Sequence, residues 1–268
     1  MVRNPTCLEI QHYNLICEVG SEPLKNYLPP VPNVVAAAAG TRSPHEGYQR
    51  GWGLEFGDLR KGVAKDRDYI EALKRAVGRT VVNPDRLMNL FLLVKFFMPK
   101  LPFGHIVEFG SYMGGSAFFL ATLAKKFLPD AMVFGLDTFT GIPTVDARVD
   151  AHSIGDFAIK DFDGLLRAQS KFGLKNLQFV RGLFSETAPA LLPKIGKIAL
   201  AHIDCDTYES VKYAYESSIP YVLPGGYLVF DDSTTSSCIG ATQAVEECVI
   251  KRDGRYSEQI FPHHVFRA

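Results

Sequence analysis

The chain has 268 residues, of which 47% are hydrophobic and 22% are charged. This composition is typical of a globular protein and excludes disorder along the whole chain. Basic and acidic residues number 29 each, so the formal net charge is zero. We therefore have no electrostatic reason to expect nucleic acid or an anionic membrane as a partner.

Targeting segments and disulfide bonds are not expected either. No apolar run reaches the roughly 20 residues of a membrane-spanning helix, and charged and polar residues interrupt the N-terminal stretch, unlike a secretory signal. The five cysteines contain no C-x-x-C pair, which argues against a zinc ribbon or a complete disulfide framework. A cytoplasmic protein with free thiols is the simplest interpretation.

Two unequal parts are expected along the chain. Residues 1–79 carry proline and alanine clusters and the Gly-rich stretch GYQRGWGLEFGD, without a pattern that predicts regular elements. They form either a surface extension or an arm that covers a pocket or a partner subunit, and a homodimer is the expected assembly. Residues 80–268 are expected to form the functional domain.

Regular elements begin near residue 84. Asn83 and Pro84 suit the N-cap and first position of a helix, which Pro99 and Pro102 end. Short apolar runs predict strands at 105–110, 132–137, 177–181, 198–204 and 226–231. Helical patterns follow at 116–127, 162–172, 187–192, 208–221 and 240–252, and the C-terminal FPHHVFRA is expected to add an antiparallel edge strand. This alternation predicts an α/β fold with a mostly parallel sheet, whose ligands bind beyond the carboxyl ends of the strands.

The first motif is VEFGSYMGGS, at residues 107–116, where a predicted strand runs through a Gly-rich turn into a helix. Tyr112 occupies the place of the second glycine of the dinucleotide fingerprint. Glu108 precedes the turn, and its carboxylate would repel a diphosphate but would suit an ammonium or a sulfonium. The alternative is a purely structural role, in which the glycines only allow the helix to pack against the strand.

Asp137 ends the next predicted strand, where a carboxylate can accept hydrogen bonds from both ribose hydroxyls of an adenosine. Phe139 lies two residues further on and is expected to contact the sugar or the base. Together with Glu108, these residues favour S-adenosylmethionine over NAD as the cofactor.

Acidic residues follow two later strands. Asp204 ends one of them, and Asp231 and Asp232 end the next. If the two strands are neighbours, about 4.8 Å apart, three carboxylates converge, and a divalent cation relieves their repulsion. Oxygen ligands suit Mg²⁺, with Mn²⁺ or Ca²⁺ as substitutes. The alternative is that Asp231 and Asp232 form a turn without binding a metal.

Three further residues of interest are Asp206, His202 and His152. Asp206 and Glu209 have the spacing of a capping box, which predicts that Asp206 caps a helix. His202 faces the same side of its strand as Asp204 and is either a base, a partner of the acidic residues or a satisfied core histidine. His152 lies in the long segment 138–161, which reads as a lid.

The combined motifs resemble a known family. VEFGSYMGGS, LDTFTGIP, GDF, FVRGLFSETAP, HIDCDTYES and LPGGYLVFDD occur in this order. The set is similar to the macrocin O-methyltransferase (TylF-like) family of metal- and S-adenosylmethionine-dependent methyltransferases. The resemblance covers about residues 80–268, and TVVNPDRLMNL also resembles the segment that precedes the family's first strand.

The resemblance implies a class I S-adenosylmethionine-dependent methyltransferase fold, Rossmann-like, with a seven-stranded sheet, an antiparallel last strand and helices on both faces. It places the metal on Asp204, Asp231 and Asp232, and the segment 182–184 near the adenine. The residues that it implies for the cofactor are Glu108, Gly110, Ser111, Gly115, Ser116, Asp137, Phe139, Gly182 and Phe184.

The expected reaction is transfer of the cofactor's methyl group to a hydroxyl of a small natural product, carried by a sugar, a phenol or a polyketide. Asp204 would serve as ligand and base, with His202 or His152 assisting. Two alternatives remain, an NAD-dependent oxidoreductase on a similar sheet and a module that binds S-adenosylmethionine without catalysis.

Overall fold

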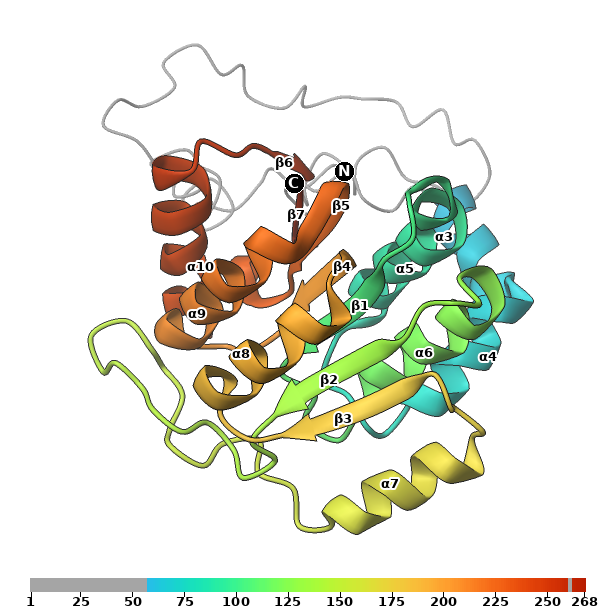
Figure 1. Cartoon of the computed structure of the whole chain (residues 1–268), viewed down its shortest axis with the longest axis horizontal. Coiled ribbons are helices and arrows are strands. Elements are labelled where there is room, and N and C mark those ends of the chain that lie inside the picture. The colour runs from blue at the N-terminus through green and yellow to red at the C-terminus, as the bar shows by residue number, and fades with distance from the viewer. Residues whose placement is uncertain (1–56, 260–261) are drawn as a thin grey trace, which may run out of the picture. The chain divides into compact units, whose positions relative to one another are not determined.

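The computed structural model describes residues 57–259 and 262–268. Its centre is a seven-stranded sheet in the order β3-β2-β1-β4-β5-β7-β6 (Figure 1). The strands are β1 His105–Phe109, β2 Val133–Asp137, β3 Leu177–Arg181, β4 Ile198–Ile203, β5 Val222–Phe230, β6 Ser257–Gln259 and β7 His264–Arg267. The predicted class I methyltransferase architecture is confirmed.

The first five strands are parallel, and β7 runs antiparallel to β5. The C-terminal strand was expected at the sheet edge, but β6 pairs with its outer side and forms the edge instead. The chain moves outward from β1 to β3 and then returns to β4 on the other side of β1. Strand order therefore reverses between β1 and β4, which is where sheets of this kind bind ligands.

Helices cover both faces of the sheet (Figure 1). Side chains alternate along β1, so Ile106 packs into one hydrophobic cluster and Val107 and Phe109 into the other. One cluster contains side chains of α4, α5, α6 and α7, and the other contains those of α8, α9 and α10. The helices are α3 Gly57–Lys65, α4 Arg67–Ala76, α5 Pro84–Leu92, α6 Gly115–Phe127, α7 Phe162–Lys171, α8 Phe184–Ile195, α9 Tyr208–Ser218 and α10 Ile239–Ala244.

Shorter helical turns extend several of these helices. They are the π-helices η1 Leu93–Phe97 and η5 Val245–Arg252 and the 3₁₀ turns η2 Met98–Lys100, η3 Ile219–Tyr221 and η4 Asp232–Thr234. At the start of α5, the Asn83 side chain accepts the N–H of Arg86 at 3.0 Å and Pro84 takes the first turn, as predicted. This cap fixes where the Arg86 side chain begins.

Part of the expected N-terminal extension belongs to the sheet's own compact unit, which spans Arg60–Ala268. Within it, α4 packs against α6, and the buried ring of Tyr69 lies edge-on to Phe91 and Phe119, with centroids 5.6 and 5.8 Å apart. The lid or oligomer role was expected for residues 1–79, of which residues 1–56 lie outside the described part of the chain, so that role stays a prediction. Among the helices that the structure describes, none has the length and apolar character needed to cross a membrane.

Candidate active site

A cavity of about 370 Å³ lies beyond the carboxyl ends of β1, β2, β4 and β5. This volume is in the range of small-molecule sites. Gly110, Ser111 and Asp137 line one end of it, and four aspartates, Asp204, Asp206, Asp231 and Asp232, line the other. The two sets of residues that the sequence singled out therefore share one cavity.

The turn after β1 has positive φ angles and a close backbone approach that glycine residues permit. Gly110 has φ +90°, and a Cβ there would lie 1.7 Å from the carbonyl oxygen of Asp204. Gly114 caps α6 with φ 77°, and Tyr112 itself has φ 46°. Glycine is needed where β1 passes this close to the segment after β4.

Asp137 organises this turn. Its Oδ2 accepts the N–H groups of Ser111 and Tyr112, both at 2.8 Å, and its Oδ1 accepts the N–H of Phe139 at 2.7 Å. In dinucleotide-binding folds, the amides of such a turn bind a diphosphate. Because a carboxylate already occupies these two amides, the turn is unsuited to a diphosphate.

Glu108 and His202 lie behind the cavity wall. Both are fully buried, are opposite each other in the β1–β4 register, and lie 3.0 Å apart between Oε1 and Nδ1. Glu108 also accepts the hydroxyl of Ser111 at 2.8 Å, and Nε2 of His202 lies 3.7 Å from Asp231. Burial opposes the charged imidazole, but Asp231 and Glu108 outweigh it and raise the pKa of His202 well above its usual value. Buried polar contacts thus run from Ser111 in the glycine turn through Glu108 and His202 to Asp231.

The predicted cofactor residues divide into two groups. Gly110, Ser111, Ser116, Asp137 and Phe184 line the cavity, whereas Glu108, Gly115, Phe139 and Gly182 are not among its lining residues. Their part in cofactor binding remains a prediction.

The four residues outside the lining have other contacts. Gly115 donates its N–H to the Arg79 carbonyl at 3.0 Å, and a Cβ there would lie 2.7 Å from that oxygen. Phe139 is buried against Phe162 and Phe179, and Gly182 donates its N–H to the Asp137 carbonyl. Gly115 thereby lets the segment 79–82 reach the cavity, which Arg79 and Val82 help to line.

Asp204, Asp231 and Asp232 converge as predicted, because β4 and β5 are parallel neighbours. One ligand oxygen of each lies within 4.8 Å of the others. Burial and the neighbouring carboxylates raise the pKa of Asp204 well above its usual value and that of Asp232 to about 6. Without a cation, this triad therefore holds protons, as repulsion requires, and its oxygen donors suit Mg²⁺.

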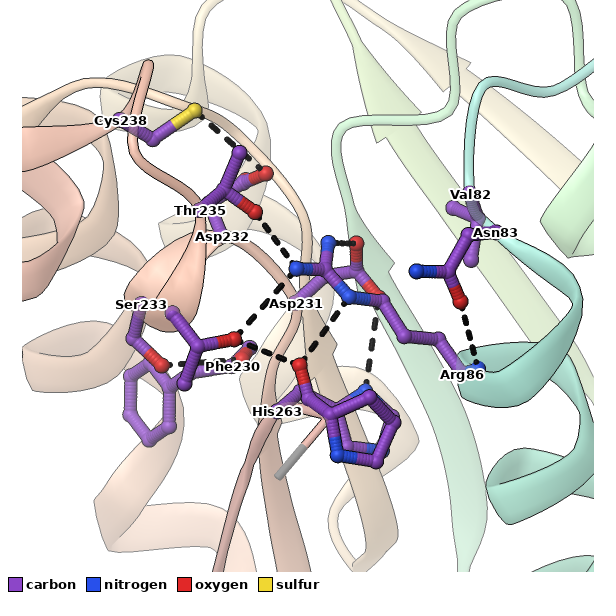
Figure 2. A network of polar contacts seen from close by, with 12 residues as sticks. Val82, Asn83, Arg86, Phe230, Asp231, Asp232, Ser233, Thr235, Cys238 and His263 are labelled. Carbon is purple, nitrogen blue, oxygen red and sulfur yellow. Dashed lines mark hydrogen bonds and ion pairs between the residues drawn. The ribbon is translucent and has the colours of Figure 1, made fainter. Parts of the chain in front are cut away.

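Asp231 differs from its two neighbours because basic groups surround it (Figure 2). Its Oδ2 lies 2.6 Å from the guanidinium of Arg86, and its Oδ1 lies 3.5 Å from Nδ1 of His263. Arg86 also donates to the Thr235 hydroxyl at 2.5 Å and to the Pro262 carbonyl at 3.2 Å. Although burial opposes ionisation, His202, His263 and Arg86 together hold the pKa of Asp231 well below its usual value.

Sequence reasoning did not identify Arg86 or His263. Arg86 lies 145 residues before Asp231 and on a helix outside the alternating pattern. The single signal was the resemblance of the segment TVVNPDRLMNL to the family, which covers Arg86 without indicating its role.

The prediction that Asp206 caps α9 is wrong. Thr207 is the N-cap of that helix, and Asp206 has φ 63°, whereas an N-cap adopts an extended backbone. The Asp206 side chain instead borders the cavity with 21% exposure, and its N–H donates to Asp232 at 2.9 Å. Burial and the charge of Asp232 raise the pKa of Asp206 to about 8.

The long segment 138–161 borders the same cavity through Ile142, His152 and Phe157. Asp150 accepts the N–H of Tyr208 at 2.9 Å, which anchors the segment at the start of α9. The ring of Phe157 lies 5.5 Å from those of Tyr112 and His152. The segment therefore forms part of the cavity wall, and its role as a lid stays a prediction.

Comparison with known proteins agrees with this geometry. The sequence model of the macrocin-O-methyltransferase (TylF) family matches residues 55–251. The chain is 30% identical over 175 residues to the 8-demethyl-8-(2,3-dimethoxy-alpha-L-rhamnosyl)-tetracenomycin-C 4'-O-methyltransferase of Streptomyces olivaceus, covering 61% of this chain and 66% of that enzyme. It is 26% identical over 196 residues to the mycinamicin III 3''-O-methyltransferase of Micromonospora griseorubida, covering 66% of this chain and 76% of that enzyme.

A solved structure shares the fold. The O-methyltransferase NovP superposes with a TM-score of 0.61 at 23% identity, over 81% of this chain and 98% of that one. The family match decides between the two enzyme classes that the Gly-rich turn left open. The chain belongs to the macrocin-O-methyltransferase (TylF) family and is an O-methyltransferase that uses S-adenosylmethionine.

Proposed function

We propose that this enzyme methylates a sugar hydroxyl of a natural product with the help of a divalent cation. The observation that carries the proposal is that the Asp137 turn and the carboxylates of Asp204, Asp231 and Asp232 line one cavity. A cofactor and a metal-held acceptor can therefore lie side by side.

The cofactor would occupy the end of the cavity beside β1 and β2. Asp137 faces the ribose in this arrangement, and Ser116 and Phe184 complete the lining at that end. S-Adenosylmethionine, when bound, supplies the methyl group as a sulfonium. The net charge of the acidic cluster favours this cationic ligand over a nucleotide diphosphate.

Asp204, Asp231 and Asp232 would hold the cation, with Mg²⁺ as the favoured ion and Mn²⁺ or Ca²⁺ as substitutes. The raised pKa values of Asp204 and Asp232 support this assignment, since burial and mutual repulsion disfavour free carboxylates side by side. A divalent cation at this place would polarise an acceptor oxygen and lower the pKa of its hydroxyl.

Asp206 is the group that we assign as the base. His202, the base considered from the sequence, has no exposed surface and acts through Asp231. Asp204 and Asp206 are both half-buried and both line the cavity, but Asp204 belongs to the triad proposed to hold the cation, which leaves Asp206 available to act on the acceptor. Asp206 is placed to take the proton of the acceptor hydroxyl. For a general base, a position within hydrogen-bonding distance of that proton is the first requirement, and a suitable pKa is the second.

The acceptor class is proposed from the relatives and from the cavity rim. The names of the two curated relatives described above place the methylated oxygen at a primed, sugar-type position. Val81 and Leu183, which are 71% and 39% exposed, line the cavity of this chain. Such apolar side chains suit a deoxysugar attached to an apolar aglycone.

We further propose a cytoplasmic homodimer in which residues 1–56 serve as the lid or oligomer arm. Because α4 is part of the sheet's compact unit, the test should delete residues 1–56 and keep residues 57–79. The arm is supported if the shortened chain folds but has a changed mass in light scattering or a raised acceptor KM. It is refuted if both are unchanged.

The decisive test measures transfer of an isotope-labelled methyl group from S-adenosylmethionine to a panel of glycosylated macrolides and aromatic polyketides, with free phenols for comparison. We expect label on sugar oxygens alone, lost after treatment with a chelator and restored by Mg²⁺. Label on phenols would refute the acceptor class, and full activity in the chelated enzyme would refute the cation.

A further inference from the structure

A second cluster of potential metal ligands adjoins the aspartate triad. His152 Nε2, Cys238 Sγ and a carboxylate oxygen of Asp206 lie within 4.8 Å of one another. They come from three separate parts of the chain, namely the segment 138–161, the turn before α9 and the residue that caps α10. Cys238 is buried and His152 is 17% exposed.

The separations of these three atoms match those around a tetrahedral ion. Sγ of Cys238 lies 3.5 Å from Nε2 of His152 and 3.6 Å from Oδ1 of Asp206, and the latter two atoms lie 3.6 Å apart. With Zn–S about 2.3 Å and Zn–N and Zn–O about 2.1 Å, tetrahedral angles put sulfur about 3.6 Å from nitrogen or oxygen and put nitrogen about 3.4 Å from oxygen. All three observed distances agree with these to within about 0.2 Å, the tolerance expected of a metal site.

The surroundings of His152 complete the pattern. Its other nitrogen, Nδ1, lies 3.6 Å from Oδ2 of Asp156. A carboxylate that accepts a hydrogen bond from the far nitrogen orients a metal-binding imidazole and makes it a stronger ligand, and Asp156 lies close to that position. Nε2 is the nitrogen turned toward the cluster, as its distances to Cys238 and Asp206 show.

The surroundings of Cys238 favour a role as a metal ligand over a role as a catalytic nucleophile. Its thiol is buried and lies 3.8 Å from the Asp232 carboxylate (Figure 2). A catalytic cysteine needs a positive surrounding that lowers the pKa of its thiol. A cation with affinity for sulfur would supply that charge and release the thiol proton on binding.

We propose that His152, Asp206 and Cys238 form a zinc site distinct from the aspartate triad. A thiolate and an imidazole select Zn²⁺ over Mg²⁺, while the all-carboxylate triad prefers Mg²⁺. Zn²⁺ bound here would tie the segment 138–161 to the start of α10 and would occupy Asp206. On the function proposed above, zinc would therefore inhibit methyl transfer.

Cobalt is the probe that tests the site without any need for activity. The full-length enzyme, saturated with Mg²⁺, is titrated with Co²⁺, and absorption is followed in the near ultraviolet, where thiolate-to-cobalt charge transfer appears. We expect a thiolate band that saturates at one equivalent and is abolished by Zn²⁺ but not by further Mg²⁺. An enzyme without a thiolate band overturns the proposal.

Two cysteine variants locate the ligand. Cys238→Ser should lose the band, whereas the matched control Cys248→Ser, a buried cysteine that does not line the cavity, should keep it. A band that survives in Cys238→Ser overturns the proposal.

His152→Ala covers the case in which Cys238→Ser does not fold. It removes a ligand from a surface segment, so we expect zinc affinity to fall by more than the roughly 10- to 100-fold that loss of an outer partner costs. Unchanged zinc affinity in a folded His152→Ala enzyme overturns the proposal as well.

Discussion

The two ends of the cavity are stabilised in opposite ways. At the β1–β2 end, the Asp137 carboxylate accepts three backbone N–H groups and shapes the Gly-rich turn, although burial still raises its pKa. At the β4–β5 end, carboxylates face one another, and burial and mutual repulsion raise the pKa of Asp204 and Asp232. One end is thus preorganised by the chain alone, and the other is completed by a cation, so the two should respond differently to substitution.

The largest effect is expected from the triad. Asp204→Asn removes a proposed ligand, and we expect kcat to fall by about 100- to 1000-fold, as when an electrostatic group at a reacting oxygen is lost. Calorimetric affinity for S-adenosylmethionine should stay within a few fold, because the Asp137 turn is untouched. Asp163→Asn, at an exposed aspartate of α7, is the control, and equal loss of cofactor affinity in Asp204→Asn would erase the distinction between the two ends.

Arg86 lines the cavity and forms an ion pair with Asp231 at the acidic end. Among the described residues that line the cavity, it is the one arginine or lysine in contact with this carboxylate. Arg86→Met leaves that buried carboxylate without its 2.6 Å ion pair, and breaking such a pair costs about 3 kcal/mol. Urea denaturation of the metal-free enzyme should show this loss in the free energy of unfolding. Arg148→Met, at an arginine that is 87% exposed, should change it little, and an unchanged free energy of unfolding in Arg86→Met would show that Asp231 needs no partner.

Asp137→Asn should affect the other end alone. An amide cannot accept the three N–H groups that the carboxylate accepts, and each hydrogen bond to a charged group is worth about 1.5–3 kcal/mol. We expect affinity for S-adenosylmethionine to fall by about 10- to 100-fold, with Mg²⁺ affinity unchanged within error. A titration in which Mg²⁺ affinity falls equally would show that the two ends are energetically one site.

The smallest effect is a dependence of stability on pH. Asp206 and Asp232 have pKa values of about 8 and about 6, above the ordinary 3.8, so between about pH 4 and pH 8 the folded protein binds more protons than the unfolded chain. Stability of the metal-free enzyme should therefore fall as pH rises through this window. The pKa of Asp231 is lowered, so its contribution to stability changes at pH values below this window.

Thermal denaturation at several pH values tests this sign. We expect a decrease of several degrees toward pH 8, at about 2–4 °C per kcal/mol for a domain of this size. The decrease should be smaller in Asp206→Asn above pH 6 and smaller again with Mg²⁺. A rise in the midpoint with pH would contradict the assigned pKa shifts.

Much of this architecture was predictable from the sequence. Apolar runs and capping residues are local signals, so β3 at Leu177–Arg181 and the start of α5 at Pro84 were placed correctly. The convergence of Asp204 with Asp231 and Asp232 was also predictable, because carboxyl ends of neighbouring parallel strands share one edge.

Tertiary structure decided the remaining features, because they depend on contacts between distant segments or on backbone geometry. The left-handed backbone of Asp206 turned an expected helix cap into a cavity residue. Arg86 reaches Asp231 across 145 residues of sequence, and His152 meets Cys238 across 86. The sequence by itself determined which residues end the strands, whereas folding alone decided which side chains neutralise them, since pairing of charges depends on distance in space.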